Sequence, residues 1–290
     1  SLREDRSFPQ GSSGNMSAAI DRANKEFWNE ICGSAFARQL GITDHSRESL
    51  ERFDRAYLDF YPYLLHYVRT SEMSGRKVME VGIGYGTLGQ KIVEAGAEYL
   101  GLDIAAQPVR MMKHRLRLAG LQGDAAQGNI LDCPVSSQSL DWVVSIGCYH
   151  HTGDIQRCID ETHRVLKLGG RATIMVYNRF SLRQWIVWPF HTWQAGLVNI
   201  GLRADYPITP KRMRKYYDSS ASGAAAPETQ FSSIKELREM FKKYSHAEFH
   251  KENCDGLIVP KLNLTVIPRQ RLLSSVGRKL GTDIYVEVRK

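Results

Sequence analysis

The sequence predicts an α/β protein with one seven-stranded, mostly parallel sheet that carries helices on both faces. From Lys77 onward, short runs of β-branched and apolar residues alternate with helical stretches, as in a sheet built through crossover helices. The chain has 290 residues, of which 42% are hydrophobic and 24% are charged. This length and composition allow one full core with additions to it.

The elements follow from local patterning. Helices are expected over residues 18–70, because apolar side chains recur there at helical spacing among interleaved charges. Strands are expected near residues 77–81, 98–103, 125–130, 140–146 and 171–177. Helices are expected near residues 86–96, 106–119 and 154–167. A later helix should begin at Ser232 or Ser233, and closing strands are expected near 245–251 and 283–289, the last of them antiparallel.

These elements divide the chain into five parts. We expect a disordered tail or cloning remnant over residues 1–15, because this stretch is polar and glycine- and serine-rich before Met16. The other parts are an N-terminal helical cap over 16–75, the sheet core over 76–180, an insertion over 181–234 and the completion of the sheet over 235–290. Sheets of this kind bind ligands at the carboxyl ends of their strands, so the insertion is expected to cover the site as a lid.

The richest motif is the stretch Val-Met-Glu-Val-Gly-Ile-Gly-Tyr-Gly-Thr, from Val78 to Thr87. Glycine at alternate positions allows backbone angles closed to other residues and lets the main chain approach a ligand. Asp103, 21 residues after Gly82, ends the next apolar run. A carboxylate at that strand tip is placed to accept hydrogen bonds from a ribose diol, which indicates a nucleoside-bearing cofactor.

Two details favour S-adenosylmethionine over a dinucleotide. The third glycine of a G-x-G-x-x-G fingerprint would fall at position 87, which is Thr. Glu80 precedes the first glycine by two residues, and a carboxylate there would repel a pyrophosphate. It would help a ligand that carries an ammonium and a sulfonium, directly or through water. The alternative is an ordinary strand-turn-helix corner with incidental glycines.

Several segments between Arg76 and Asn178 resemble, in order, the core of class I S-adenosylmethionine-dependent methyltransferases. They are Glu80–Gly86, Gly101–Ile104, Gly128–Pro134, Leu140–His151 and Arg164–Arg171. These segments are most similar to the small-molecule branch of the family, which includes quinone-biosynthesis methylases. The resemblance implies a Rossmann-like fold. The family often has Asp at position 129, which accepts from the adenine amino group; Asn129 can still accept through its carbonyl.

The resemblance implies S-adenosyl-L-methionine as cofactor and a set of residues that hold it. The cofactor-binding candidates are Glu80, Gly82, Gly84, Tyr85, Gly86, Asp103, Ile104, Asn129, Ile130 and Gly147. Methyl transfer to a small aromatic or hydrophobic acceptor by direct SN2 displacement is the expected reaction. Alignment of nucleophile, methyl carbon and sulfur supplies most of the barrier reduction.

His150 and His151 at the tip of the fourth strand are the candidate bases, since imidazole titrates near neutrality. The alternative is that they only shape the turn. Metal binding by these residues with His163 is not expected, because no ligand spacing recurs. The candidate substrate contacts are Phe27, Trp28, Tyr149, Tyr177 and Asn178. For Phe27, Trp28 and Tyr177, ordinary packing is the alternative.

Residues 180–202 form the most apolar part of the chain, with Trp185, Trp188 and Trp193. Pro189 and scattered polar residues argue against a transmembrane span. Three interpretations stay open: a lid over a lipophilic pocket, a membrane-surface element, or a contact in a homodimer.

The net charge of +8 comes from the last 110 residues, which hold 18 Lys or Arg against 10 Asp or Glu. This excess keeps tRNA methylation open as an alternative function, although no RNA-binding module is evident and nucleic acid is not the expected partner. A non-catalytic binding subunit is a further alternative. Five scattered cysteines without a C-x-x-C pair are expected to be free thiols, which favours a cytoplasmic location.

Overall fold

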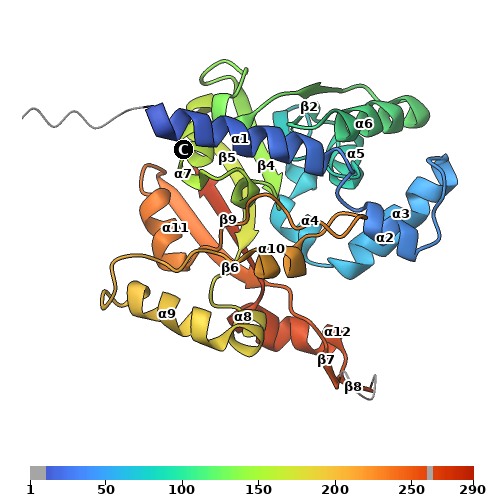
Figure 1. Ribbon diagram of the computed structural model, residues 1–290. Helices are drawn as coiled ribbons and strands as arrows, with labels where there is room; N and C mark the ends of the chain where they lie inside the picture. Colours follow the sequence, from blue (N-terminus) through green and yellow to red (C-terminus); the bar gives the residue numbers. More distant parts are fainter. Residues whose placement is uncertain (1–10, 260–263) are drawn as a thin grey trace, which may run out of the picture.

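The computed structural model describes residues 11–259 and 264–290. It contains a seven-stranded sheet in the order β3-β2-β1-β4-β5-β9-β6 (Figure 1). The strands are β1 (Lys77–Val81), β2 (Glu98–Asp103), β3 (Asp124–Gln127), β4 (Leu140–Ile146), β5 (Leu166–Tyr177), β6 (His246–Glu252) and β9 (Asp283–Arg289). The first five are parallel, and β9 lies antiparallel between β5 and β6. The predicted mostly parallel, seven-stranded sheet with an antiparallel last strand is therefore confirmed.

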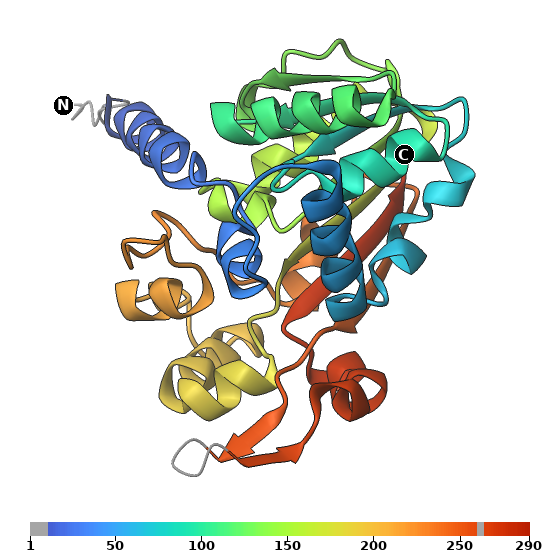
Figure 2. The same cartoon turned by 90° about the vertical axis from the view of Figure 1, so that its right-hand side faces the viewer.

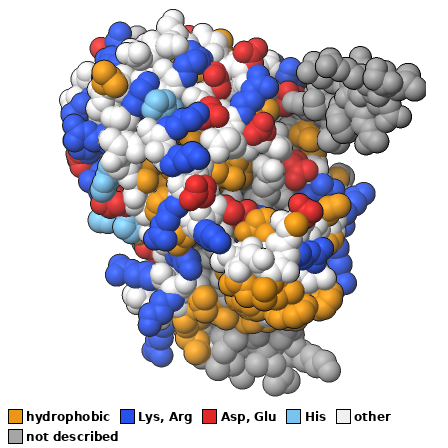
Figure 3. All heavy atoms as spheres, turned by 90° about the vertical axis from the view of Figure 1, so that its left-hand side faces the viewer, with side chains coloured by type: hydrophobic (Ala, Val, Ile, Leu, Met, Phe, Trp, Pro, Cys, Tyr) orange, Lys and Arg blue, Asp and Glu red, His pale blue; other side chains and the backbone are white. Residues whose placement is uncertain are grey.

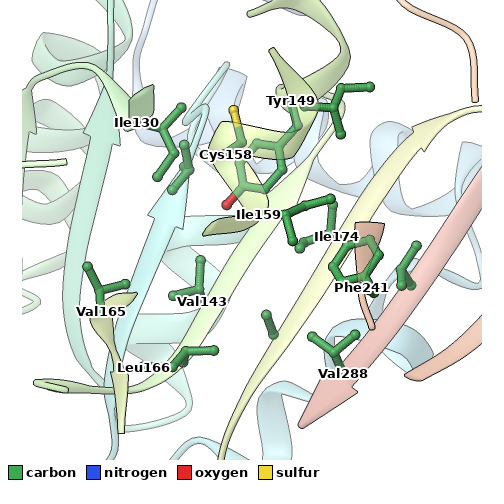
Figure 4. Close-up of a cluster of buried hydrophobic side chains, with 14 of the residues drawn as sticks. Ile130, Val143, Tyr149, Cys158, Ile159, Val165, Leu166, Ile174, Phe241 and Val288 are labelled. Carbon is green, nitrogen blue, oxygen red and sulfur yellow. The ribbon is translucent and has the colours of Figure 1, made fainter. Parts of the chain in front are cut away.

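Helices cover both faces of the sheet, which is why its central strands read as continuous apolar runs. One face carries α4 (Leu64–Val68), α5 (Thr87–Glu94) and α6 (Ala106–Ala119). The other carries α7 (Ile155–Val165) and α11 (Ile234–Met240). Figure 4 shows the core on this second face, where side chains of α7 meet those of β4, β5 and β9.

Strand β1 leads outward to β2 and β3 on one side, and β4 and β5 continue the sheet on the other. The strand order therefore reverses between β1 and β4. In doubly wound sheets a crevice opens at this point, outside the carboxyl ends of the strands. Two short 3₁₀ turns, η2 (Ile130–Asp132) and η3 (Tyr149–His151), lie at the same edge, after β3 and β4 respectively.

An N-terminal layer of α1 (Gly11–Trp28), α2 (Ser34–Gln39) and α3 (Arg47–Phe60) packs beside this edge (Figure 2). The tail expected over residues 1–15 lies partly outside the described residues, and its last five residues belong to α1. A small apolar cluster joins the layer to the core: the rings of Phe53 and Tyr85 stack with centroids 3.9 Å apart.

The insertion contains α8 (Leu182–Val187), α9 (Pro189–Asn199) and α10 (Lys211–Tyr217). Helix α11 begins after Ser233, whose hydroxyl accepts from the Glu236 amide while the Glu236 carboxylate accepts from the Ser233 amide. This capping box accounts for the predicted helix start. The sequence analysis assigned no element between β6 and β9. The structure has there the hairpin β7 (Leu257–Val259) and β8 (Leu264–Ile267), then α12 (Arg269–Leu272), η4 (Leu273–Gly277) and α13 (Arg278–Leu280).

Candidate cofactor pocket and active site

The glycine loop between β1 and α5 requires its glycines. Gly82, Gly84 and Gly86 have φ angles of 82°, 56° and 82°, in the left-handed region that side chains disfavour. A Cβ on Gly82 would lie 2.6 Å from the Cβ of Cys148, and one on Gly86 would lie 2.8 Å from Cδ of Arg115. The loop therefore turns sharply and packs closely against Cys148 and Arg115.

A buried ion pair fixes this loop from behind. The Arg115 guanidinium donates to the Tyr85 carbonyl at 2.6 Å and to both carboxylate oxygens of Asp54 at 2.9 Å each. Arg115 lies on α6 and Asp54 on α3, so the pair joins the N-terminal layer to the core. A bidentate charge-assisted pair of this kind combines strength with fixed geometry.

Asp103 connects the loop to the tip of β2. One of its carboxylate oxygens accepts from the Ile83 amide and the other from the Ala105 amide, both at 2.9 Å. Burial raises the pKa of Asp103 to about 6. A carboxylate oxygen has more than one acceptor site, so both oxygens can still accept from a vicinal diol.

Glu80 lies under the same loop and faces α5. The Tyr99 hydroxyl donates to its carboxylate at 2.5 Å, and burial raises the pKa of Glu80 to about 8. Gly89 on α5 leaves no space for a Cβ against these two groups. Tyr99 was not predicted as the partner of Glu80, because the contact depends on how β1 and β2 pair.

A pocket opens over this loop, at the carboxyl ends of β1, β2 and β4. All ten residues expected to bind the cofactor line it, from Glu80 through the glycine loop to Asp103, Ile104, Asn129, Ile130 and Gly147. Cys32, Phe53 and Tyr57 of the N-terminal layer also line it. The structure therefore brings together segments spread over more than 100 residues of sequence.

Helix α1 contributes a face that the sequence analysis did not assign to the cofactor. Asp21, Asn24 and Trp28 all line the pocket. Their spacing of three and four residues places them on one side of a helix, and this spacing was the signal available in the sequence. Of the three, only Trp28 was a candidate.

Both ends of the Asn129 side chain already have partners within the protein. Its side-chain oxygen accepts from the Leu131 amide at 3.0 Å, and its amide donates to the Asp21 carboxylate at 2.8 Å. Burial raises the pKa of Asp21, while the hydrogen bond from Asn129 opposes this shift. The carboxylate at this end of the pocket therefore belongs to α1 rather than to the residue that follows β3.

His151 is the candidate base that lines the pocket. Its Nδ1 lies 2.8 Å from the Glu228 carbonyl, which can only accept, so Nδ1 carries the proton in the neutral ring. Its Nε2 lies 3.6 Å from a carboxylate oxygen of Asp218. The Tyr177 hydroxyl donates to the same carboxylate at 3.2 Å, and burial raises the pKa of Asp218. Trp28 packs on the imidazole with ring centroids 4.7 Å apart.

His150 lies behind His151 and does not line the pocket. It is fully buried between the rings of His151 and Tyr177, and within the described residues neither ring nitrogen has a hydrogen-bond partner. Burial lowers the pKa of His150 well below its usual value. The structure therefore gives His150 a neutral packing position, because the η3 turn sends the two neighbouring side chains in different directions.

The other candidates for substrate contact divide in the same way. Tyr149 lies in the core shown in Figure 4, where its hydroxyl and that of Thr162 are 2.6 Å apart. Asn178 is buried, donates to the Gly281 carbonyl and accepts from the Phe180 amide. Phe27 packs edge-on against Trp28, and Tyr177 reaches Asp218. None of these four residues lines the pocket; each supports a residue or segment beside it.

The insertion lies beside the pocket rather than over it. No residue of 181–234 lines the pocket, although Asp218 and Glu228 contact the two ring nitrogens of His151. Asp218 is a further functional candidate that sequence reasoning missed. It lies 67 residues from His151 along the chain, at the end of α10, and no local pattern marks it.

Sequence comparison places this site in a known family. Residues 78–170 match the family model described as "Methyltransferase domain". The ubiquinone biosynthesis O-methyltransferase of Klebsiella pneumoniae (strain 342) is 30% identical over 121 residues, which cover 41% of this chain and 50% of that protein. The phthiotriol/phenolphthiotriol dimycocerosates methyltransferase of Mycobacterium tuberculosis (strain ATCC 25177 / H37Ra) is 29% identical over 126 residues, or 42% and 44%. The chain thus spans about half the length of the curated relatives it matches.

Solved structures share the fold at low sequence identity. An S-adenosylmethionine-dependent methyltransferase from Mesorhizobium loti superposes with a TM-score of 0.52 at 16% identity, covering 80% of this chain and 100% of that one. A putative methyltransferase from Haloferax volcanii, solved in complex with the Trm112 methyltransferase activator, gives 0.51 at 17% identity, covering 81% and 92%. These likenesses concern the fold alone.

The pocket residues fit the cofactor that the family and fold imply. The Asp103 carboxylate suits a ribose diol. Glu80 beneath the loop disfavours a pyrophosphate, so the site suits a ligand without phosphate groups. The buried Oδ1 of Asn24 lines the pocket and has no hydrogen-bond partner among the described residues, so it is an acceptor that a ligand donor can satisfy. Residues 78–170 therefore match a methyltransferase domain, and the pocket that this part of the chain helps to form suits S-adenosylmethionine.

Proposed function

We propose that this protein transfers the methyl group of S-adenosylmethionine to a hydroxyl of a small aromatic or lipophilic acceptor. The observation that carries this proposal is the juxtaposition of two sets of groups in one pocket. The glycine loop and Asp103 suit the cofactor, and His151, backed by Asp218, lines the same pocket. The names of the two relatives, an O-methyltransferase of ubiquinone biosynthesis and a lipid methyltransferase, support an acceptor of this class.

Two carboxylates would hold the cofactor. Asp103 would accept from the ribose hydroxyls, and Asp21, which lines the pocket beside Asn129, would accept from the adenine amino group. Glu80, whose pKa burial raises to about 8, would hold the glycine loop in place through its hydrogen bond with Tyr99. When bound, S-adenosylmethionine supplies a methyl carbon on a sulfonium that leaves without further activation.

His151 would act as the base. Because its Nδ1 donates to the Glu228 carbonyl, its Nε2 holds the lone pair that can remove a proton from an acceptor hydroxyl. The Asp218 carboxylate would then stabilise the imidazolium, and the Tyr177 hydroxyl would hold Asp218 in place. Trp28 would limit the rotation of the ring and exclude water from one side.

The test measures methyl transfer from S-adenosylmethionine to 4-dodecylcatechol in detergent micelles. We expect His151→Ala to lower kcat by about 100-fold or more, the contribution typical of a positioned base. Its affinity for S-adenosylhomocysteine, measured by isothermal titration, should change little, because no cofactor contact is removed. His246→Ala, on the exposed end of β6, is the matched control and should keep full turnover.

Two outcomes would contradict the proposal at different points. Unchanged turnover in His151→Ala would show that positioning alone accounts for the reaction. Failure of the wild-type protein to bind S-adenosylhomocysteine would remove the assignment of the cofactor to this pocket.

A further inference from the structure

Helices α8 and α9 expose the large side chains that soluble helices usually bury. We define the apolar face as eight residues that are between 39% and 91% exposed: Trp185, Ile186, Val187, Phe190, Trp193, Ile200, Leu202 and Ile208. Figure 3 shows hydrophobic side chains gathered in the lower part of the molecule on this side. Single exposed apolar residues are common, but a contiguous group of this size marks an interaction surface.

The fully buried side chains of these two helices are small or polar. The buried residues of α8 and α9 are Gln184, Thr192 and Ala195. The Thr192 hydroxyl donates to the Gln184 carbonyl at 3.0 Å, and the Gln184 amide reaches the Met213 sulfur at 3.6 Å. A surface helix of a globular protein instead buries its apolar side chains and exposes its polar ones. The two helices are thus built for an apolar medium on their outer side.

Positive charge borders the apolar face. Residues 185–202 contain no Asp, Glu, Lys or Arg, whereas residues 203–215 contain five basic residues and one acidic residue, Asp205. Arg203, Lys211, Arg212 and Lys215 are exposed. The loop before α10 lies against α9, where His191 approaches the Ile208 carbonyl at 3.4 Å, and Lys235 donates to the Asn199 carbonyl at 2.8 Å. The basic residues therefore border the apolar side chains in space as well as in sequence.

This combination distinguishes between possible occupants. A second copy of the same face would bring two positive rims together, which opposes association. An anionic bilayer would receive the Trp and Phe side chains at its interface and attract the basic rim. Across the described residues no helix is both long and apolar enough to cross a membrane, and two short helices lying in the interface need no such length.

We propose that the apolar face docks the protein on the surface of a membrane that contains anionic phospholipids. The half-buried Trp188 links this face to the site: its ring lies 5.0 Å from that of Tyr216 and 6.2 Å from that of Tyr217. The Tyr217 ring lies 5.0 Å from that of Tyr177, which contacts Asp218. An aromatic wall thus runs from the docking surface to the groups that hold His151. The proposal stands independently of methyl transfer, because it concerns binding alone.

The test is co-sedimentation of the full chain with vesicles, without cofactor. We expect binding to vesicles of phosphatidylcholine with one quarter phosphatidylglycerol, weaker binding to phosphatidylcholine alone, and loss of the difference at high salt. The double variant Phe190→Gln/Trp193→Gln should bind the anionic vesicles at least about tenfold more weakly than the wild type, since it removes two interfacial aromatic side chains. Leu168→Gln, at an 80% exposed position on β5 outside the apolar face, is the control and should bind like the wild type.

Thermal unfolding checks that the double variant folds; its midpoint should not fall, because both side chains are exposed in the free protein. Absence of wild-type binding to both kinds of vesicle would overturn the proposal. So would a double variant that binds like the wild type. A dimer in analytical ultracentrifugation that the double variant abolishes, without any vesicle binding, would assign the face to a second copy instead.

Discussion

The N-terminal layer and the insertion are both helical additions to the same sheet, yet they relate to the pocket in opposite ways. Helices α1 and α3 turn polar and aromatic side chains inward, and Asp21, Asn24 and Phe53 line the pocket. Helices α8 and α9 turn their aromatic side chains outward, and the insertion lines none of the pocket. The comparison teaches that the layer before the sheet completes the cofactor site, whereas the insertion positions one catalytic candidate and presents a surface.

This difference has a physical basis in what each region buries. The N-terminal layer is joined to the core by the buried Asp54–Arg115 pair and by the Phe53–Tyr85 stack. The first half of the insertion is joined to the rest of the chain by the partly exposed ion pair between Arg183 and Asp255. Its second half reaches the site through polar contacts with the two histidines, among them those of Asp218 and Glu228 with His151 and of the Gln230 amide with the His150 carbonyl. Predictions that perturb each region separately test the comparison.

The largest effect is expected from Asp54→Ala in the N-terminal layer. The substitution leaves the fully buried Arg115 guanidinium without its carboxylate, and breaking a buried pair in this way costs about 3–5 kcal/mol. Urea denaturation followed by circular dichroism measures the free energy of unfolding. Asp59→Ala, on the exposed side of the same helix, should change the free energy of unfolding little. Equal losses in both variants would show that the ion pair between Asp54 and Arg115 has no special role in stability.

A smaller effect is expected from Asp21→Ala. Loss of a hydrogen bond to a charged acceptor should weaken binding of S-adenosylhomocysteine by about 10- to 100-fold. The adenine-specific readout is the preference for S-adenosylhomocysteine over S-inosylhomocysteine, which has a carbonyl in place of the amino group. Isothermal titration should show that this preference falls in Asp21→Ala and is kept in Glu26→Ala, an exposed position on the same helix. An unchanged preference would leave Asp21 as a structural partner of Asn129.

The pH dependence of cofactor binding should report Asp103. Because burial raises its pKa to about 6, the carboxylate is mostly protonated at pH 5 and mostly ionised at pH 7. Only the ionised form accepts from both ribose hydroxyls, so affinity for S-adenosylhomocysteine should rise about tenfold between these values. The same raised pKa means that the free folded protein binds the proton more tightly than the unfolded chain. Its contribution to stability therefore decreases as pH rises from about 4 to 6.

Isothermal titration at pH 5 and pH 7 measures this rise, and Asp103→Asn should flatten it. A slope that survives in Asp103→Asn would assign the titration to Glu80 or Asp21, whose pKa values are also raised by burial.

The smallest effect is expected from substitutions in the apolar face, because this face should not influence cofactor binding. Phe190→Gln/Trp193→Gln should bind S-adenosylhomocysteine within about twofold of the wild type, because neither side chain lines the pocket. The same titration measures it. A tenfold loss of affinity would show that the insertion closes over the site and would remove the contrast between the two regions.

The sheet and the cofactor loop were predictable because their signals are local. Gly82, Gly84 and Gly86 are required by backbone conformation, and Asp103 follows from the end of a single strand. The His150–His151 pair was less predictable, since a 3₁₀ turn decides which ring enters the pocket. The C-terminal hairpin β7–β8 was missed because its two short strands pair only with each other.

The sequence by itself determined the order of strands and helices, the glycine corner and the acidic strand tips, because each depends on backbone preferences within one segment. Only the tertiary structure decided that Asp21 of α1 meets Asn129 in the pocket, that Asp218 lies beside Nε2 of His151, and that the aromatic side chains of α8 and α9 face outward. These relations join residues from separate elements. Burial and hydrogen bonding across the fold set them, and no single segment of the sequence contains that information.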